Sequence, residues 1–247
     1  MKYFIQLFLL IGIVNYLFAQ GNITIKQDPS LPKLINRHID MNTSIAKAIL
    51  NSHSYIEYRR MISNRIAEGK SSGNEQTEDL LEYSILNETR MNRLDKTMKV
   101  SVQNSLRLKN LHKNYIWIVL SEGWCGDAAQ LLPIFNKMAN ESEAIEMKIV
   151  FRDENIAVMN LFLTNQAQAI PKLIIIDKAT GSVINHWGPR PKGASDLIKA
   201  YKAKYGVVDA NAKTELQLWY LHDKGLSTQN EIIEIMMKEE TMMLQNH

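Results

Sequence analysis

The stretch SEGWCGDAAQ, Ser121 to Gln130, contains Cys125, the only cysteine among 247 residues. It follows YIWIVL, residues 115–120, an unbroken apolar run rich in β-branched and aromatic residues that predicts a strand covered on both faces. After it, apolar residues recur at helical spacing, at Ala128, Leu131, Leu132, Ile134, Phe135 and Met138. Cys125 is therefore expected where a strand gives way to a helix.

The pattern downstream predicts an α/β domain with a central mixed sheet flanked by helices. Further elements are expected as strands over 145–151, 173–176 and 182–187, and as helices over 155–164 and 194–205. The order β-α-β-α-β-β-α implies a parallel pair joined by a crossover and an antiparallel hairpin on the same sheet. Gly181 would turn that hairpin.

Helical patterns flank this domain on both sides. One amphipathic helix is expected from Thr43 or Ser44 to Gly69, and another over 77–99. Charges on the second predict a solvated face, at Arg90, Arg93, Asp95 and Lys96. Two more helices are expected over 214–221 and 228–244. The last is started by a capping-box pattern, Thr228-x-x-Glu231, before an apolar pair.

The amino terminus has the layout of a secretory signal. Residues 1–19 combine Lys2, an apolar run and a small residue, Ala19, before Gln20. A membrane anchor is the alternative, but Gln6 and Asn15 interrupt a run that is short of the ~20 apolar residues of a span. We expect cleavage, no stable membrane span afterwards, and a periplasmic or extracellular protein. Residues 20–40 contain two prolines and predict a linker.

The expected organisation is thus a signal segment over 1–19, a linker over 20–40, a helical extension over 41–103, an α/β domain over 104–207 and a second helical extension over 208–247. With 45% hydrophobic residues the chain can form a sizeable core. Its 29 basic and 26 acidic residues are interspersed, so no nucleic-acid partner is expected. The six histidines have no ligand spacing, so we expect neither a metal nor another cofactor.

Cys125 is the candidate reactive group. The free N–H groups and positive dipole end of a helix N-terminus stabilise a thiolate and can lower a cysteine pKa from ~8.5 to between ~3.5 and ~7.5. The carboxylate of Asp127 opposes this, so the sequence leaves the net direction open. A lone cysteine can also be a small buried hydrophobe. Trp124, Gly126 and the junction between elements favour an accessible thiol.

Three features together resemble the thioredoxin superfamily in content and order: Trp124-Cys-Gly-Asp127 with Pro133, then Ile170-Pro171 before a strand, then Gly181 in a hairpin. The chain is most similar to uncharacterised bacterial thioredoxin-like proteins with a WCGD motif and one active-site cysteine. Their similarity extends to RMNRLDK (90–96), RDEN (152–155) and WGPRP (187–191).

This resemblance implies a thioredoxin-like fold in which Cys125 is the nucleophile and Pro171 a cis-proline facing it. The backbone of Ile170 would then offer hydrogen bonds to a partner peptide. Arg190 in the WGPRP loop would lie nearby, where it either holds the thiolate or a partner carboxylate, or pairs with a neighbouring acid. Ala128 stands where dithiol members have a second cysteine.

Two functions follow. In the first, Cys125 forms mixed disulfides with protein or small-molecule thiols and disulfides, and an external reductant releases it, because the chain lacks the second thiol of a dithiol reductase. In the second, the protein is a redox-inactive module that binds a protein or peptide. Peroxide sensing through a sulfenic acid ranks last, since no residue specifically demands it.

Overall fold

The computed structural model describes residues 31–244, with side chains described from Asp40 to Thr241. The chain divides into two units, residues 1–40 and 41–247. The elements are α2 (Leu31–Leu50), α3 (Tyr55–Ala67), α4 (Glu78–Thr97), α5 (Val102–Lys109), β1 (Tyr115–Ser121), α6 (Gly126–Ala139), β2 (Ile145–Phe151), α7 (Ile156–Met159), β3 (Lys172–Asp177), β4 (Val183–Trp187), α8 (Lys192–Tyr205), α9 (Ala210–Asp223) and α10 (Leu226–Leu244).

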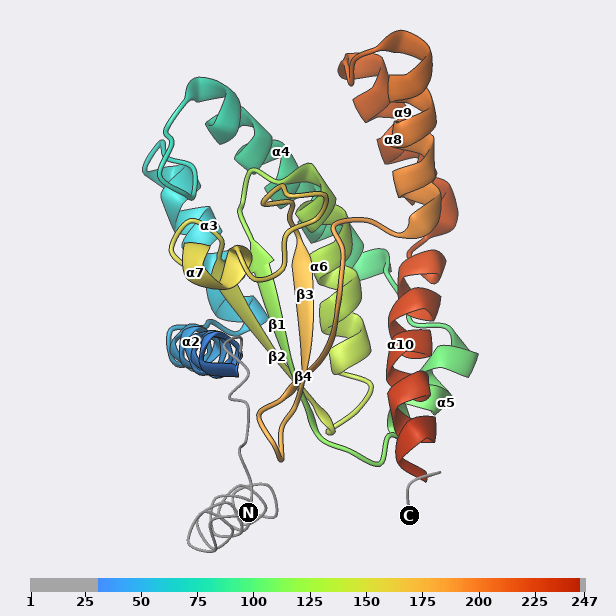
Figure 1. Cartoon of the computed structure of the whole chain (residues 1–247). Helices are drawn as coiled ribbons and strands as arrows, with labels where there is room; N and C mark the ends of the chain where they lie inside the picture. Colours follow the sequence, from blue (N-terminus) through green and yellow to red (C-terminus); the bar gives the residue numbers. More distant parts are fainter. Residues whose placement is uncertain (1–30, 245–247) are drawn as a thin grey trace, which may run out of the picture. The chain divides into compact units, whose positions relative to one another are not determined.

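Four strands form one mixed sheet in the order β2-β1-β3-β4. β1 pairs with β2 in parallel and with β3 in antiparallel orientation, and β4 is antiparallel to β3. The central position of β1 explains its apolar sequence, because a strand with neighbours on both sides and helices on both faces meets no water. In Figure 1, α3 and α7 lie on one side of the strands and α6 and α10 on the other.

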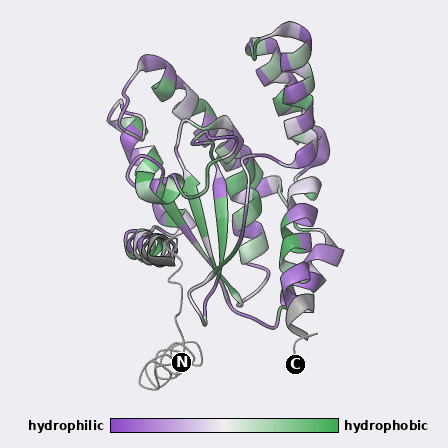
Figure 2. Cartoon of the chain, in the orientation of Figure 1, coloured by the Kyte–Doolittle hydropathy of each residue, from purple (hydrophilic) through white to green (hydrophobic). Residues whose placement is uncertain are grey.

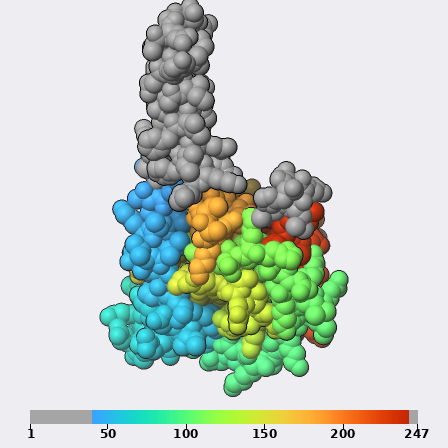
Figure 3. All heavy atoms as spheres, turned by 90° about the horizontal axis from the view of Figure 1, so that it is seen from below, coloured from blue at the N-terminus to red at the C-terminus, as the bar shows by residue number. Residues whose placement is uncertain are grey.

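The core follows this arrangement. Figure 2 shows that the strands and α6 are the most continuously hydrophobic elements, whereas the surrounding helices alternate between apolar and polar residues. Trp117 in β1 and Phe135 in α6 are fully buried. The turn between β3 and β4, on the side seen in Figure 3, and the loop that leaves β1 toward α6 lie at opposite ends of the sheet. The predicted α/β architecture, a central mixed sheet flanked by helices with helical extensions on both sides, is confirmed.

Two predictions before the sheet are wrong. The linker expected over 20–40 is helical from Leu31, and Pro32 suits that helix because its missing N–H is not needed in a first turn. The helix expected from Thr43 or Ser44 to Gly69 is two helices. The chain breaks because Ser54 starts α3 with a capping box to Glu57. The predicted signal segment and residues 20–30 lie outside the described residues.

Other boundaries also differ. The helix expected over 155–164 shortens to the four residues of α7, and α5 was not predicted. The capping box predicted at Thr228 is wrong, because α10 begins at Leu226 and Thr228 lies within it. Within the described residues, no helix combines the length and apolar character needed to cross a membrane.

Candidate functional site

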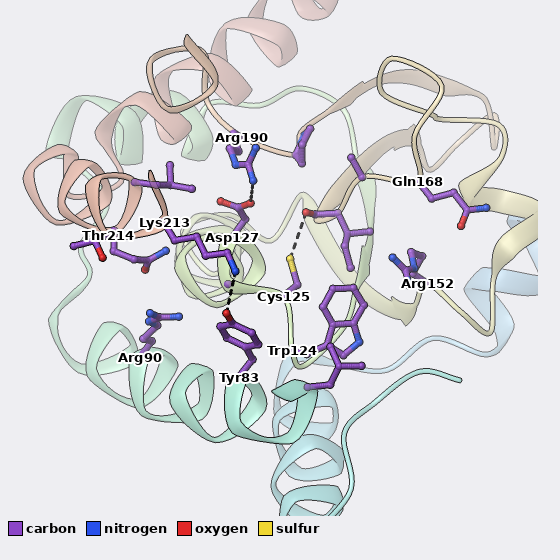
Figure 4. A pocket seen from close by; sticks show the side chains of 17 residues that line it. Tyr83, Arg90, Trp124, Cys125, Asp127, Arg152, Gln168, Arg190, Lys213 and Thr214 are labelled. Carbon is purple, nitrogen blue, oxygen red and sulfur yellow. Dashed lines mark hydrogen bonds and ion pairs between the residues drawn. The ribbon is translucent and has the colours of Figure 1, made fainter. Parts of the chain in front are cut away.

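Cys125 is the N-cap of α6, directly after the loop that leaves β1. Its sulfur accepts a hydrogen bond from the backbone N–H of Ala128 at 3.4 Å and donates one to the carbonyl of Ile170 at 3.4 Å. The Ile170–Pro171 peptide bond is cis. Residues 45 positions apart in the sequence therefore meet at the sulfur. In Figure 4 the hydrogen bond that the Cys125 sulfur donates is drawn as a dashed line.

The thiol was expected to be accessible, and the structure buries it; the direction of its pKa shift, which the sequence left open, is upward. The Cys125 side chain is only 8% exposed. Burial, and after it the nearby Asp127 carboxylate, raise the pKa of its thiol to about 12, although the Ala128 and Asp127 N–H groups and Arg190 act to lower it. The helix N-terminus does act in the expected direction, but desolvation outweighs it. The thiol is therefore protonated at neutral pH.

Asp127 is the electrostatic centre of the site. Its carboxylate pairs with the guanidinium of Arg190 at 2.6 Å and accepts a hydrogen bond from the hydroxyl of Tyr220 at 2.8 Å. Of the roles open to Arg190, the structure has the ion pair with a neighbouring acid. The pKa of Arg190 is raised because Asp127 stabilises its charge against burial.

The WGPRP loop packs against the backbone at Pro171, and this packing places Arg190 beside Asp127. The Gly188–Pro189 bond is cis, and Gly188 has φ +113°, a conformation that favours glycine. A Cβ at Gly188 would come within 2.3 Å of the Pro171 carbonyl oxygen, so no side chain fits. The buried Lys172 donates hydrogen bonds to the Gly188 carbonyl at 3.2 Å and to the Thr164 hydroxyl at 2.6 Å. These contacts fix Arg190 beside α6.

The amino-terminal helices support the loop that precedes Cys125. Asn87 in α4 donates a hydrogen bond to the Gly123 carbonyl at 2.9 Å, and Ser72 accepts one from the Gly123 N–H at 2.7 Å. The fully buried Glu122 binds the Ser72 hydroxyl and the Asp153 N–H, and burial raises its pKa. No local sequence pattern marks these residues, because their partners lie 31 to 51 positions away.

A cavity of about 530 Å³ opens next to the sulfur. Its wall contains all the predicted site residues except Pro171, and it is completed by side chains of α4 and α9. In Figure 4, Tyr83 and Arg90 approach from α4, Lys213 and Thr214 from α9, and Trp124 and Arg152 from the opposite side. The two helical extensions therefore narrow access to Cys125. The sequence alone did not indicate which of their residues would do so.

Three basic residues of the cavity wall were not predicted to lie there. Arg152 pairs with Asp153 at 2.7 Å and stacks on Trp124, with its guanidinium carbon 4.9 Å from a ring centroid. Arg90, expected on a solvated face, is half-buried in the cavity wall instead. Lys213 was not singled out, and no local pattern marks it. Across the described residues, histidine, cysteine and acidic side chains form no group of three or more suited to a metal.

The chain was compared with protein families and with solved structures. A family model described as "Thioredoxin" matches residues 73–202. A crystal structure of a protein of unknown function from Pseudomonas aeruginosa is similar, with a TM-score of 0.53 and 13% identity, over 78% of this chain and 97% of that one. An HIV epitope scaffold gives a TM-score of 0.47 at 15% identity, over 75% and 99% of the two chains.

No curated protein matches the chain. The family match covers more than half of the sequence, including Cys125, the Ile170–Pro171 bond and Arg190. The chain belongs to the thioredoxin family.

Proposed function

We propose that the protein is a monothiol member of the family, which forms mixed disulfides through Cys125 and depends on an external thiol for release. The observation that carries this proposal is the position of the sulfur: it lies in the cavity wall at the N-cap of α6, and Ala128, three residues on, has no thiol. Trp124, Gly126, Asp127, Ile170, Pro171 and Arg190 support the site.

The reaction cycle needs two sulfur compounds besides the protein, first a disulfide and then a thiol. The Cys125 thiolate attacks a disulfide, one new S–S bond forms to the protein, and the other half of the disulfide leaves as a thiolate. A second thiol then attacks the partner's sulfur in the mixed disulfide. The external thiol and the partner then leave together as a new disulfide, and Cys125 is released as a thiolate that takes up a proton. The protein ends the cycle in the oxidation state in which it began.

Burial makes this reaction slow in the described conformation. Because the Cys125 pKa is raised to about 12, the thiolate fraction at pH 7 is small. The rate should therefore rise about tenfold per pH unit between pH 7 and 9, since the thiolate fraction does so well below the pKa. Deprotonation of the Cys125 thiol is therefore the step that burial makes unfavourable.

The test is to incubate the folded protein with a small disulfide at several pH values and follow the intact mass. We expect one adduct per chain, its loss on addition of a monothiol, and no adduct with Cys125→Ser. An adduct that appears only after unfolding with denaturant would refute the proposal.

A second candidate is a redox-inactive binding module. The observation in its favour is the same burial, because a protonated thiol packed against Ile170 is a satisfactory cavity wall. This alternative predicts that ligand binding and cellular function survive Cys125→Ser, whereas the monothiol proposal predicts that function is lost while the fold is retained.

We further propose that the chain is exported after cleavage behind Ala19, to the periplasm or the extracellular space. The support is the sequence of residues 1–19 alone. The mass of the mature protein recovered from the native host tests this: a chain that still carries residues 1–19 would contradict it.

A further inference from the structure

The cavity beside Cys125 is strongly cationic. Four basic side chains line it, from Arg90, Arg152, Arg190 and Lys213, and among the described residues of its wall only Asp127 is acidic. A concave site lined by one sign of charge attracts ligands of the opposite sign, because its apolar walls focus the field. The residues that line this cavity therefore favour an anion.

Two of these cations are already paired. Arg190 binds Asp127 at 2.6 Å and Arg152 binds Asp153 at 2.7 Å. Arg90 and Lys213 have no ion pair with any described residue. They make only neutral hydrogen bonds, from Arg90 to the Asn87 side-chain oxygen at 2.8 Å and from Lys213 to the Tyr83 hydroxyl at 3.0 Å.

Arg90 is a half-buried cation that no described carboxylate neutralises. Burial and the nearby Arg93 both lower its pKa. Its guanidinium lies at the start of α6, since a Cβ placed on Gly126 would be 3.7 Å from Nη1 of Arg90. A carboxylate that binds here would offset the burial of Arg90 and would lie beside the residue that follows Cys125.

Lys213 lies on the other helical extension, in α9, and its contact with Tyr83 joins α9 to α4 at the cavity (Figure 4). The ammonium group is exposed and mobile about four single bonds, so it can turn from the neutral hydroxyl to an anion. Thr214 and Gln217, also in α9, offer further hydrogen-bonding groups in the wall. Arg90 and Lys213 thus present two separate positive positions to one ligand.

We propose that the cavity selects a small disulfide that bears two carboxylates, one for Arg90 and one for Lys213, and presents its S–S bond to Cys125. This inference rests on the proposed monothiol function and names its substrate class. The volume of about 530 Å³ falls within the roughly 300–1,000 Å³ of small-molecule sites. In the reaction, the Cys125 thiolate forms an S–S bond to one half of the disulfide, and the other half leaves as a carboxylate-bearing thiolate.

The first experiment compares three disulfides of similar length: 3,3′-dithiodipropionate, which is dianionic, 2-hydroxyethyl disulfide, which is neutral, and cystamine, which is dicationic. The rate of adduct formation at Cys125 is divided by the rate with free cysteine, which removes intrinsic reactivity. We expect the normalised rate of the dianion to exceed that of the neutral compound on the order of tenfold, and that of the dication to be lowest. Equal normalised rates would overturn the inference while leaving the monothiol function intact.

Variants locate the effect. Arg90→Gln and Lys213→Gln should each reduce severalfold the ratio of the normalised rate with the dianion to that with the neutral disulfide. Lys202→Gln, which removes an exposed cation of α8 outside the cavity, is the matched control and should retain the full preference. A preference that persists in the Arg90→Gln, Lys213→Gln double variant would refute the assignment.

The second experiment separates binding from chemistry. Suberate has the length of 3,3′-dithiodipropionate, with two CH₂ groups in place of the sulfurs, and cannot react. We expect suberate to raise the melting temperature of Cys125→Ser, and the two glutamine substitutions to abolish that shift. Binding of suberate without any adduct on the wild-type protein would support the anion site and refute the monothiol function. Adducts on the wild-type protein without suberate binding would do the reverse.

Discussion

The hydroxyl of Tyr220 donates a hydrogen bond of 2.8 Å to the carboxylate of Asp127, and so joins the carboxyl-terminal extension to the first turn of α6. The same carboxylate faces Arg190. Cys125 stands two residues before Asp127, so the environment of its sulfur depends on groups contributed by α9 and by the WGPRP loop. The extension helices therefore influence the thiol as well as enclosing the cavity.

Asp127→Asn should increase the reactivity of Cys125. The Asp127 carboxylate raises the thiol pKa, and its loss would also leave Arg190 free to stabilise the thiolate. We expect alkylation by iodoacetamide at pH 7 to become severalfold faster or more. The measurement is the rate of adduct formation by mass spectrometry, under conditions in which circular dichroism shows both proteins folded.

Tyr220→Phe is the control for this substitution. It removes a hydrogen bond to the same carboxylate but keeps the negative charge beside Cys125. We expect a much smaller change in the alkylation rate. Equal acceleration in both variants would mean that loosened packing, rather than charge, controls the thiol.

Ala128→Cys should create an internal disulfide with Cys125. The Ala128 N–H lies 3.4 Å from the Cys125 sulfur, and both side chains are buried at the start of α6. We expect mild oxidation to remove both titratable thiols, and the reduced variant to reduce a model disulfide that the parent does not turn over. Ala129→Cys, one residue further along the helix and also buried, is the matched control and should remain a dithiol. Two free thiols in oxidised Ala128→Cys would contradict the placement of residue 128.

The sequence predicted the strand–cysteine–helix junction because local periodicity carries that information. An apolar run of strand length and a helical spacing of apolar residues are both visible within 25 positions. The role of Arg90 was not visible in this way. Its neighbours Arg93 and Lys96 are exposed, but Arg90 faces the cavity because α4 packs beside α6, which is a tertiary fact.

The capping-box prediction failed for a related reason. The pattern Thr228-x-x-Glu231 is typical of a helix start, but the carboxylate of Glu231 instead accepts hydrogen bonds from the Trp187 indole and the Lys192 N–H, each at 2.8 Å. Those donors lie 44 and 39 residues away. Glu231 therefore does not cap its own helix but makes a tertiary contact, here called the tertiary tie, that joins α10 to the end of β4 and the start of α8.

Glu231→Gln should destabilise the protein for this reason. The amide keeps one acceptor oxygen, so one of the two donors loses its partner, and the charge at the start of α8 is lost. We expect the free energy of unfolding to fall by roughly 1–3 kcal/mol. Chemical denaturation followed by tryptophan fluorescence measures it. Glu234→Gln, an exposed residue one turn further along α10, is the control, and an equal loss there would contradict the tertiary tie.

Lys172→Met tests how much burial of a charged amine destabilises the protein. This amine hydrogen-bonds the Gly188 carbonyl in the WGPRP loop. Lys172 is 1% exposed, and burial lowers its pKa from 10.5 to about 8. Between these two pH values the unfolded chain binds more protons than the folded one, so this lysine makes stability rise with pH and leaves a penalty below pH 8.

Methionine fills a similar volume and has no charge to desolvate. It also loses the hydrogen bonds to Gly188 and Thr164, a loss that does not depend on pH in the same way. The quantity to follow is therefore the unfolding free energy of the variant minus that of the wild type, because the Cys125 thiol titrates in both proteins and cancels. We expect this difference to decrease by on the order of 1–3 kcal/mol from pH 7 to pH 10. Lys202→Met, at an exposed position, should show no such decrease. A difference that stays constant for Lys172→Met would mean that burial does not lower the pKa of this amine.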